Sequence, residues 1–270
     1  MHGFSTRVGG VSHVYGRDDL NLGYTKEDKR TNVERNRERF VSAVVGPTRS
    51  ANSTAWPIVA LRQVHSDVIH YVEGADEPMR VGDGMVTNQA GLLLAIQAAD
   101  CLPIILVDPK RCAVGIFHAG WRPTLKRIAE KGVGAMRMHF GSKAADLRAA
   151  IGPGIQGCCY QVGEEVREKF EAQFPYAKKL FREVKESDPV REKYPLLFLT
   201  ARAPGHGQLP KKIFLDLVEA NRQQLLAMGV RAKNIHASPL CTSCRTDLLF
   251  SYRAEKGRTG RLMGVVGIRG

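Results

Sequence analysis

A continuous apolar run at residues 91–97, Gly-Leu-Leu-Leu-Ala-Ile-Gln, places the strongest constraint on the fold of this chain. A strand with one face in water alternates apolar and polar side chains, whereas an unbroken apolar run is typical of a strand covered on both faces. A chain of 270 residues is long enough to supply that cover from its own core. We therefore expect a buried strand here, with a further layer of structure on each side.

The remaining patterns predict a mixture of strands and helices. Apolar segments at 104–107 and 113–117 flank the turn-forming residues Asp108–Arg111, which predicts a hairpin. Further strands are expected at 57–63, 67–72, 147–151 and 262–268, and helices at 31–45, 123–140, 163–174 and 213–228. Because strands and helices do not alternate strictly, we predict an α/β (α+β) layered sandwich with mixed sheets. No linker is evident, so we expect a single domain over 1–270.

Local signals refine some of these elements. Thr31 followed by Glu34 fits a capping box, with Thr31 as N-cap. The helix at 213–228 is expected to place Phe214 on its apolar face and to end at Gly229. Residues 6–23 are rich in Gly, Ser and Asn and are expected to form a loop. Residues 178–212 are charged and poorly patterned, which predicts a long surface excursion.

The chain carries a formal net charge of +13, which favours an anionic partner or a solvated basic surface. The basic residues are dispersed, and their densest runs, Arg35–Arg39 and Lys178–Lys179, have no interleaved aromatic residues for stacking on bases. Nucleic acid is therefore disfavoured as a partner. No apolar run reaches the length of a membrane span, and the amino terminus lacks the apolar region of a signal peptide. We expect a soluble cytoplasmic protein, monomer or homodimer, with no membrane partner.

Three metal-ligating side chains fall at the ends of expected strands: His65, Cys101 and His118. Two imidazoles and one thiolate form a three-ligand zinc set that leaves a fourth position for water or substrate, as catalytic zinc requires. The spacing alone does not distinguish this site from a buried cysteine with two hydrogen-bonded core histidines. There is no dinucleotide-binding glycine motif, no Walker loop and no Gly-x-Ser-x-Gly elbow in the chain.

The residue identities in several segments are more specific than the spacing of the candidate ligands. In order, these are Thr6-Arg7-x-Gly9-Gly10-Val11-Ser12, Leu20-Asn21-Leu22-Gly23, Gln63-Val64-His65, Asp83-Gly84, Ala99-Asp100-Cys101-x-Pro103, His118-Ala119-Gly120-Trp121, Ile151-Gly152-Pro153, Cys159-Tyr160-x-Val162-Gly163 and Thr259-Gly260-Arg261. Together they resemble the YfiH/YlmD family, also called the laccase-domain or polyphenol-oxidase-like family, over nearly the whole chain. The resemblance implies that most members carry a further strand before the stretch that begins at Phe4 here, so the edge of the sheet is expected to differ.

The resemblance implies a single-domain layered fold related to cysteine-hydrolase-like toxins. It also implies phosphorolysis of purine nucleosides such as adenosine, inosine, guanosine and methylthioadenosine, with adenosine deamination, and for some members peptidoglycan editing. It assigns zinc to His65, Cys101 and His118, with copper as an alternative metal. Eight histidines without a His-x-His pair disfavour a multicopper polyphenol oxidase, the older family name.

Phosphorolysis needs donors for phosphate and contacts for the purine. Arg7, beside a glycine-rich turn, can cradle an anion, although the same pattern fits an ordinary turn with a solvated arginine. Gln63 shares a strand face with His65 and is expected to line the pocket, so Arg7 and Gln63 join the metal ligands as candidate catalytic residues. The candidate substrate-binding residues are Arg7, Gly10, Ser12, Asn21, Trp121 and Arg253.

Two assignments stay open in the sequence. Deamination needs a carboxylate that shuttles protons, and Asp100 and Asp83 are the two candidates. Asp100 is equally compatible with a structural role as a hydrogen-bond acceptor. Cys241 and Cys244 form one Cys-x-x-Cys, which could bind a second metal with Cys158–Cys159 or His236, form a redox disulfide or simply pack.

Three hypotheses therefore compete. The first is a zinc-dependent purine nucleoside phosphorylase with adenosine deaminase activity. The second is a metal-free hydrolase or amidase that edits peptidoglycan precursors, with Cys101 as nucleophile and His65 or His118 as base. The third is an RNA-binding module, supported only by the net charge.

Overall fold

A computed structural model describes residues 1–46, 56–75, 78–185, 193 and 211–270. The chain forms two compact units, one made of Met1–Gln156 with Leu217–Gly270 and the other of Gly157–Asp216. Each unit has its own sheet structure. The single domain expected over 1–270 stays a prediction.

The larger unit contains two mixed sheets. The first has the strand order β1 (His2–Phe4), β14 (Leu262–Gly267), β6 (Leu93–Ala98), β3 (Ile58–Ala60), with only β3 and β6 parallel. The second has the order β13 (Ile235–Ala237), β9 (Arg148–Ile151), β7 (Leu102–Asp108), β8 (Ala113–Ala119), β5 (Gly84–Thr87), β4 (Ile69–Tyr71). Its outer pairs β13–β9 and β4–β5 are parallel and the inner pairs antiparallel. The predicted mixed-sheet α/β architecture is confirmed.

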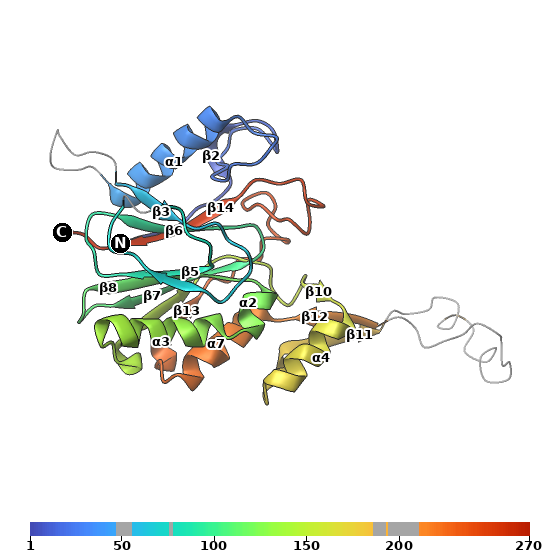
Figure 1. Cartoon of the computed structure of the whole chain (residues 1–270). Helices are drawn as coiled ribbons and strands as arrows, with labels where there is room; N and C mark the ends of the chain where they lie inside the picture. Colours follow the sequence, from blue (N-terminus) through green and yellow to red (C-terminus); the bar gives the residue numbers. More distant parts are fainter. Residues whose placement is uncertain (47–55, 76–77, 186–192, 194–210) are drawn as a thin grey trace. The chain divides into compact units, whose positions relative to one another are not determined.

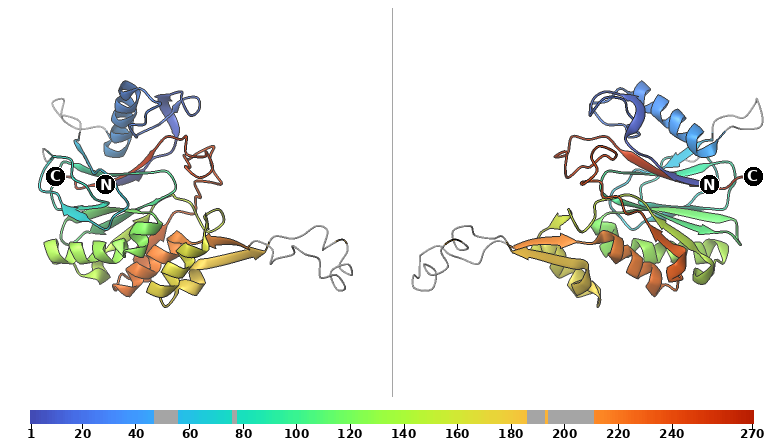
Figure 2. Two further views of the ribbon diagram at one scale, coloured as in Figure 1. Left: turned by 45° about the vertical axis from the view of Figure 1, so that its right-hand side comes forward. Right: turned by 180° about the vertical axis from the view of Figure 1, so that it is seen from behind.

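The buried strand expected at 91–97 is β6, and its alternating side chains join two separate cores. Leu94 and Ile96 pack with Ile105 and Ile116 of the six-stranded sheet. Ala95 points the other way and packs with residues that include Phe40 of helix α1 (Arg30–Val45). Within this unit, Figures 1 and 2 show α1, the four-stranded sheet and the six-stranded sheet as successive layers. The unbroken apolar run is thus explained by cover on both faces.

Helices α3 (Ile128–Phe140) and α7 (Leu217–Ala227) cover the outer face of the six-stranded sheet (Figure 1). The ring of Phe117, on β8, lies so close to Gly132 that a Cβ there would come within 2.8 Å of it. The expected helix at 123–140 is two helices, α2 (Trp121–Leu125) and α3, because Arg127 between them adopts a left-handed conformation with φ 65°. Among the described residues, no helix combines the length and the apolar character needed to cross a bilayer.

Several local predictions are corrected. Helix α1 begins at Arg30, so Thr31 lies inside it, and its N-cap Lys29 makes no side-chain capping bond. The expected loop at 6–23 contains strand β2 (Val8–Ser12). Phe214 belongs to a strand, because α7 starts only at Leu217, whereas Gly229 ends that helix with φ 90° as expected.

The smaller unit is a three-stranded antiparallel sheet with one helix. Its strand order is β10 (Gln161–Val162), β12 (Lys211–Leu215), β11 (Phe181–Lys185), and the helix is α4 (Glu164–Gln173). The helix expected at 163–174 is α4, and its residues Val166 and Phe170 are buried. The surface excursion expected at 178–212 therefore contains β11 and the first residues of β12, which pair with each other. Its residues 186–192 and 194–210 lie outside the described part of the chain.

Candidate metal centre

The antiparallel pairing of β7 and β8 brings two predicted ligands together. Cys101 immediately precedes β7, and His118 lies on β8 opposite Pro103. The hairpin therefore closes the 17-residue gap between them in sequence. His65 comes from the loop between β3 and β4, where it has a left-handed backbone with φ 58° rather than the strand end expected from its sequence.

The three side chains converge on one point. Cys101 Sγ lies 3.8 Å from His65 Nε2, and the two imidazole ring centroids are 4.9 Å apart. One ligand atom from each residue lies within 4.8 Å of the others. Tetrahedral zinc with such ligands separates them by roughly 3.4–3.8 Å, so small side-chain rotations would bring all three into coordination. The donor set fits zinc and leaves one position open.

Asp83 contacts the His118 imidazole and the backbone of the loop that carries His65. It is fully buried, and its Oδ1 lies 2.8 Å from Nδ1 of His118. The same carboxylate accepts hydrogen bonds from the backbone N–H groups of Val64, His65 and Ser66 and from the Ser66 hydroxyl. With Nδ1 bound to Asp83, Nε2 of His118 is the nitrogen that faces the other ligands. Asp83 is therefore placed to orient ligands.

The electrostatics of the site favour a thiolate. Burial alone would raise the pKa of the Cys101 thiol, but the positive charge of His118 and hydrogen bonds from His118 and His65 lower it to about 6. Burial alone would lower the pKa of His118, whereas the Cys101 thiolate and Asp83 raise it to about 9. Hydrogen bonds from His118 and Ser66 outweigh burial and hold the pKa of Asp83 well below its ordinary value. A thiolate is the form of cysteine that binds metal and acts as a nucleophile.

Asp100 supports the site from the other side. Its buried carboxylate accepts hydrogen bonds from the hydroxyls of Thr242 and Ser251 at 2.6 and 2.7 Å and from the Arg253 backbone N–H at 2.6 Å. Its own backbone has φ 95°, which turns the chain sharply just before Cys101. These contacts favour the structural role that the sequence left open for Asp100.

The glycine-rich turn is built differently from an anion cradle. Arg7 is buried, and its guanidinium donates to the carboxylates of Asp19 and Glu255 and to the carbonyl oxygens of Tyr15 and Thr246. All of these acceptors belong to the protein, which disfavours the expected phosphate contact. Gly10 is required for a different reason, since a Cβ there would meet the Asp19 carbonyl oxygen at 2.0 Å.

Two other expected substrate ligands in this region, Ser12 and Asn21, are also buried in structural contacts. Ser12 donates its hydroxyl proton to Asp28 at 2.6 Å and accepts a hydrogen bond from Asn36. The Asn21 amide donates to the same Asp28 carboxylate, and its oxygen accepts from the backbone N–H of Arg261. Together with Arg7 and Gly10, these residues hold the amino-terminal segment in place.

The remaining candidates are distributed around the centre. Gln63 uses its side-chain amide to bond both the N–H and the C=O of Gln97, as a strand partner would, and its place in the substrate pocket stays a prediction. Trp121 opens α2 directly after Gly120, and Arg253 is exposed next to the Asp100 carboxylate that binds its backbone. Gly120 was missed by the sequence analysis. A Cβ at this position would lie 2.7 Å from Cys101 Sγ, a close approach that only the assembled fold reveals.

Comparison with known proteins identifies the family to which this chain is similar. The model of the family described as "Multi-copper polyphenol oxidoreductase laccase" matches residues 1–269. The chain is 34% identical to the purine nucleoside phosphorylase YlmD of Geobacillus stearothermophilus, over 98% of this chain and 92% of that protein. It is 35% identical to adenosine deaminase RL5, from an unknown prokaryotic organism, over 66% of this chain and 59% of that protein.

A solved structure shows the same fold. The crystal structure of the hypothetical protein YfiH from Bacillus licheniformis superposes with a TM-score of 0.79 at 32% identity, covering 99% of this chain and 92% of the other. A multicopper site needs many imidazoles, whereas the described residues gather only two histidines at a candidate metal site. By its sequence motifs, its fold and the extent of these matches, the chain belongs to the YfiH/YlmD family.

Proposed function

We propose that this chain is a zinc-dependent purine nucleoside phosphorylase that also deaminates adenosine. The observation that carries the proposal is the open three-ligand set of His65, Cys101 and His118, with Asp83 holding the second imidazole. The names of two relatives, a purine nucleoside phosphorylase and an adenosine deaminase, support these substrate classes.

In the phosphorolytic reaction, a phosphate oxygen bonds to C1′ of the ribose while the C1′–N9 bond breaks. The bonding electrons pass to the purine, which takes up a proton as it leaves. In the deamination, water adds at C6 of adenine and ammonia departs. When bound, zinc supplies Lewis acidity at the open position.

The chain's own residues would divide the remaining tasks. His65, Cys101 and His118 bind the metal, and Asp83 keeps the Nδ1 proton of His118 in place. We assign phosphate binding to Arg253 rather than Arg7, because Arg253 is exposed and Arg7 faces two carboxylates. Trp121 follows Gly120, the residue that lies close to Cys101, and is the candidate for stacking on the purine.

The test measures hypoxanthine release from inosine with and without phosphate, and ammonia release from adenosine, alongside zinc content. We expect about one zinc at this centre per chain, phosphate-dependent hypoxanthine release and loss of both activities in Cys101→Ser. Cys112→Ser is the matched control, because Cys112 is exposed in the turn at the opposite end of the β7–β8 hairpin. Unchanged turnover in Cys101→Ser would contradict the proposal.

A second candidate is a metal-free hydrolase or amidase with Cys101 as nucleophile. The observation that favours it is the Cys101–His118–Asp83 arrangement together with the lowered pKa of the thiol. Iodoacetamide discriminates the two, since a zinc-bound thiolate is protected whereas a free one is alkylated. Rapid labelling of Cys101 in the purified protein, before any chelator is added, would favour this second function.

A further inference from the structure

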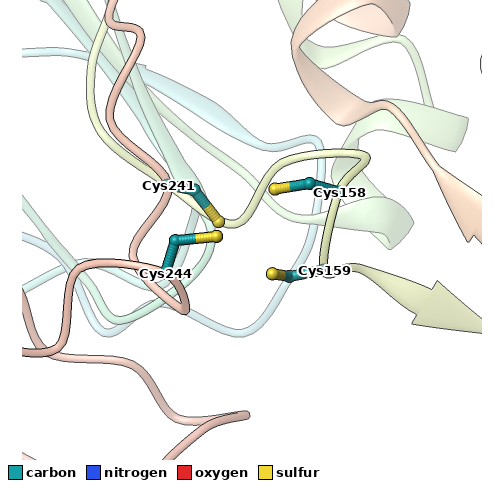
Figure 3. A group of neighbouring side chains, drawn as sticks. All are labelled: Cys158, Cys159, Cys241 and Cys244. Carbon is teal, nitrogen blue, oxygen red and sulfur yellow. The ribbon is translucent and has the colours of Figure 1, made fainter.

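A second group of metal-ligating side chains consists entirely of cysteines. Cys158 and Cys159 are adjacent in sequence, and Cys241 and Cys244 form a Cys-x-x-Cys. The four sulfur atoms lie within 4.8 Å of one another. Figure 3 shows all four turned toward a common centre. Neither the proposed reaction nor any residue of the His65 centre uses this cluster.

Hydrogen bonds within the larger unit hold the segment that leads to Cys158 next to Cys241. Cys241 is buried and forms a parallel bridge with Gly154, and the Thr242 N–H donates to the Gly154 carbonyl at 3.1 Å. Gln156, only two residues before Cys158, donates its side-chain amide to the Ser238 carbonyl at 3.1 Å. The chain therefore enters Cys158 from a segment already anchored next to Cys241.

Each pair of cysteines is also bent so that both of its sulfurs face the same side. The Arg245 N–H donates to the Cys241 carbonyl at 3.1 Å, which closes a turn over the Cys-x-x-Cys. Residues 157–159 form a second turn, and the Gln161 N–H donates to the Cys159 carbonyl at 2.9 Å. In an extended strand, adjacent side chains would point to opposite faces. The turn removes that obstacle for Cys158 and Cys159.

Two chemistries can bring thiols together: disulfide bonds and metal coordination. A disulfide satisfies sulfurs in pairs and gives no reason for two pairs to converge on one point. Tetrahedral zinc with four thiolates separates the sulfurs by roughly 3.8 Å, close to the observed arrangement. A set of four thiolates leaves no open position, which is the signature of structural zinc.

We propose that Cys158, Cys159, Cys241 and Cys244 bind a structural zinc ion, separate from the open centre at His65, Cys101 and His118. The ion would hold the turn at 241–244 in place. Thr242, inside that turn, donates its hydroxyl proton to Asp100 at 2.6 Å, and Asp100 directly precedes Cys101. The closed site would thereby support the backbone that presents Cys101 to the open one.

The experiment measures zinc stoichiometry by elemental analysis of reduced, purified protein. We expect about two zinc ions per chain in the wild type, and about one in Cys158→Ser, Cys244→Ser and Cys101→Ser. Cys112→Ser should retain both, because Cys112 belongs to neither cluster. Cys158 and Cys244 are exposed, so serine at either position leaves the core unchanged.

Cobalt substitution identifies the ligands independently of enzyme activity. Cobalt bound to Cys101→Ser should show the strong thiolate charge-transfer and visible bands of a tetrahedral four-thiolate site, and Cys244→Ser should lose them. A mercurial titration of the wild type should release zinc in two steps and needs no variant. One zinc per chain that is lost only in Cys101→Ser, or a disulfide among the four cysteines in the zinc-loaded protein, would overturn the proposal.

Discussion

Asp83 and His118 are joined by a buried contact of 2.8 Å between Oδ1 and Nδ1, and the same carboxylate binds the backbone of the loop that carries His65. One side chain thus sets the orientation of two ligands from different elements. This relationship makes Asp83 the most informative position at which to perturb the metal centre without removing a ligand.

Asp83→Asn should lower zinc affinity by about 10–100-fold, the usual effect of losing a partner that orients a ligand. The amide cannot accept every hydrogen bond that the carboxylate accepts, so the His118 imidazole and the loop that carries His65 are held less firmly. Competition with a chromophoric chelator measures the affinity. Asp108→Asn is the matched control, because Asp108 is also buried and accepts two backbone N–H groups, but at the far end of the same hairpin. Equal affinities in the two variants would contradict this role.

Gly120→Ala should weaken zinc binding and activity while the protein stays folded. The added methyl group would lie 2.7 Å from Cys101 Sγ and 3.2 Å from His65 Cδ2, so at least one ligand must move. Zinc content after dialysis and thermal unfolding measure the two effects.

Gly134→Ala supplies the comparison for Gly120→Ala, because a Cβ added at Gly134 meets nothing within 4 Å. The methyl group enters open space there, and alanine in a helix interior is favoured over glycine by about 1 kcal/mol. Gly134→Ala should therefore keep its zinc and unfold at the same or a higher temperature. Full zinc retention in Gly120→Ala would show that the site tolerates this group.

Arg7→Gln should reduce the free energy of unfolding by about 3–5 kcal/mol, because it leaves the Asp19 and Glu255 carboxylates without their buried cation. Urea unfolding measures the loss, and the KM for phosphate should stay unchanged in protein that remains folded. Arg17→Gln is the control, since Arg17 belongs to the same segment but its side chain is 92% exposed. A raised KM for phosphate with unchanged stability would restore Arg7 as an anion ligand.

Asp28→Asn should make the protein less sensitive to acid. Burial alone would raise the pKa of Asp28, but hydrogen bonds from Ser12, Asn21 and Asn32 outweigh it and lower the pKa below the ordinary value of 3.8. The ionised carboxylate therefore stabilises the fold above pH 3.8, and this contribution is lost as the pH falls through the lower folded-state pKa. We expect wild type and variant to differ by about 1–3 kcal/mol at neutral pH.

The difference should narrow below pH 3.8, and urea unfolding over a pH series measures it. Asp18→Asn removes an exposed carboxylate from the same part of the chain and should change the free energy of unfolding at neutral pH by less than about 1 kcal/mol. A constant difference between wild type and Asp28→Asn down to about pH 2, well below the ordinary pKa, would argue against this assignment.

Local patterns predicted the parts of the fold that depend on neighbouring residues. The apolar run at 91–97 and the turn after Asp108 indicated a doubly covered strand and the β7–β8 hairpin, both of which the structure confirms. The hairpin then explains why Cys101 and His118 meet. Arg127 shows the limit of such patterns, because a single left-handed residue divides a segment whose apolar periodicity indicates one helix.

The interpretation of Arg7 as an anion ligand is disfavoured for a physical reason. An arginine beside glycines is compatible with an anion site, but its partners are Asp19 and Glu255, and the latter is 248 residues away in sequence. The role of Asp83 was equally hidden, since its contacts with His118 and the His65 loop exist only when β5 pairs with β8. Chemical type is visible in a sequence, whereas the partner of a buried charge depends on the assembled fold.

The left-handed backbone of His65, with φ 58°, has a consequence for laboratory evolution. Such a conformation costs about 1–3 kcal/mol for a residue other than glycine. Glycine at position 65 would relieve that strain and would remove a proposed metal ligand. A library screened only for heat tolerance in the presence of a chelator should therefore enrich glycine at this position and deliver robust but inactive proteins, so zinc and activity have to be part of the screen.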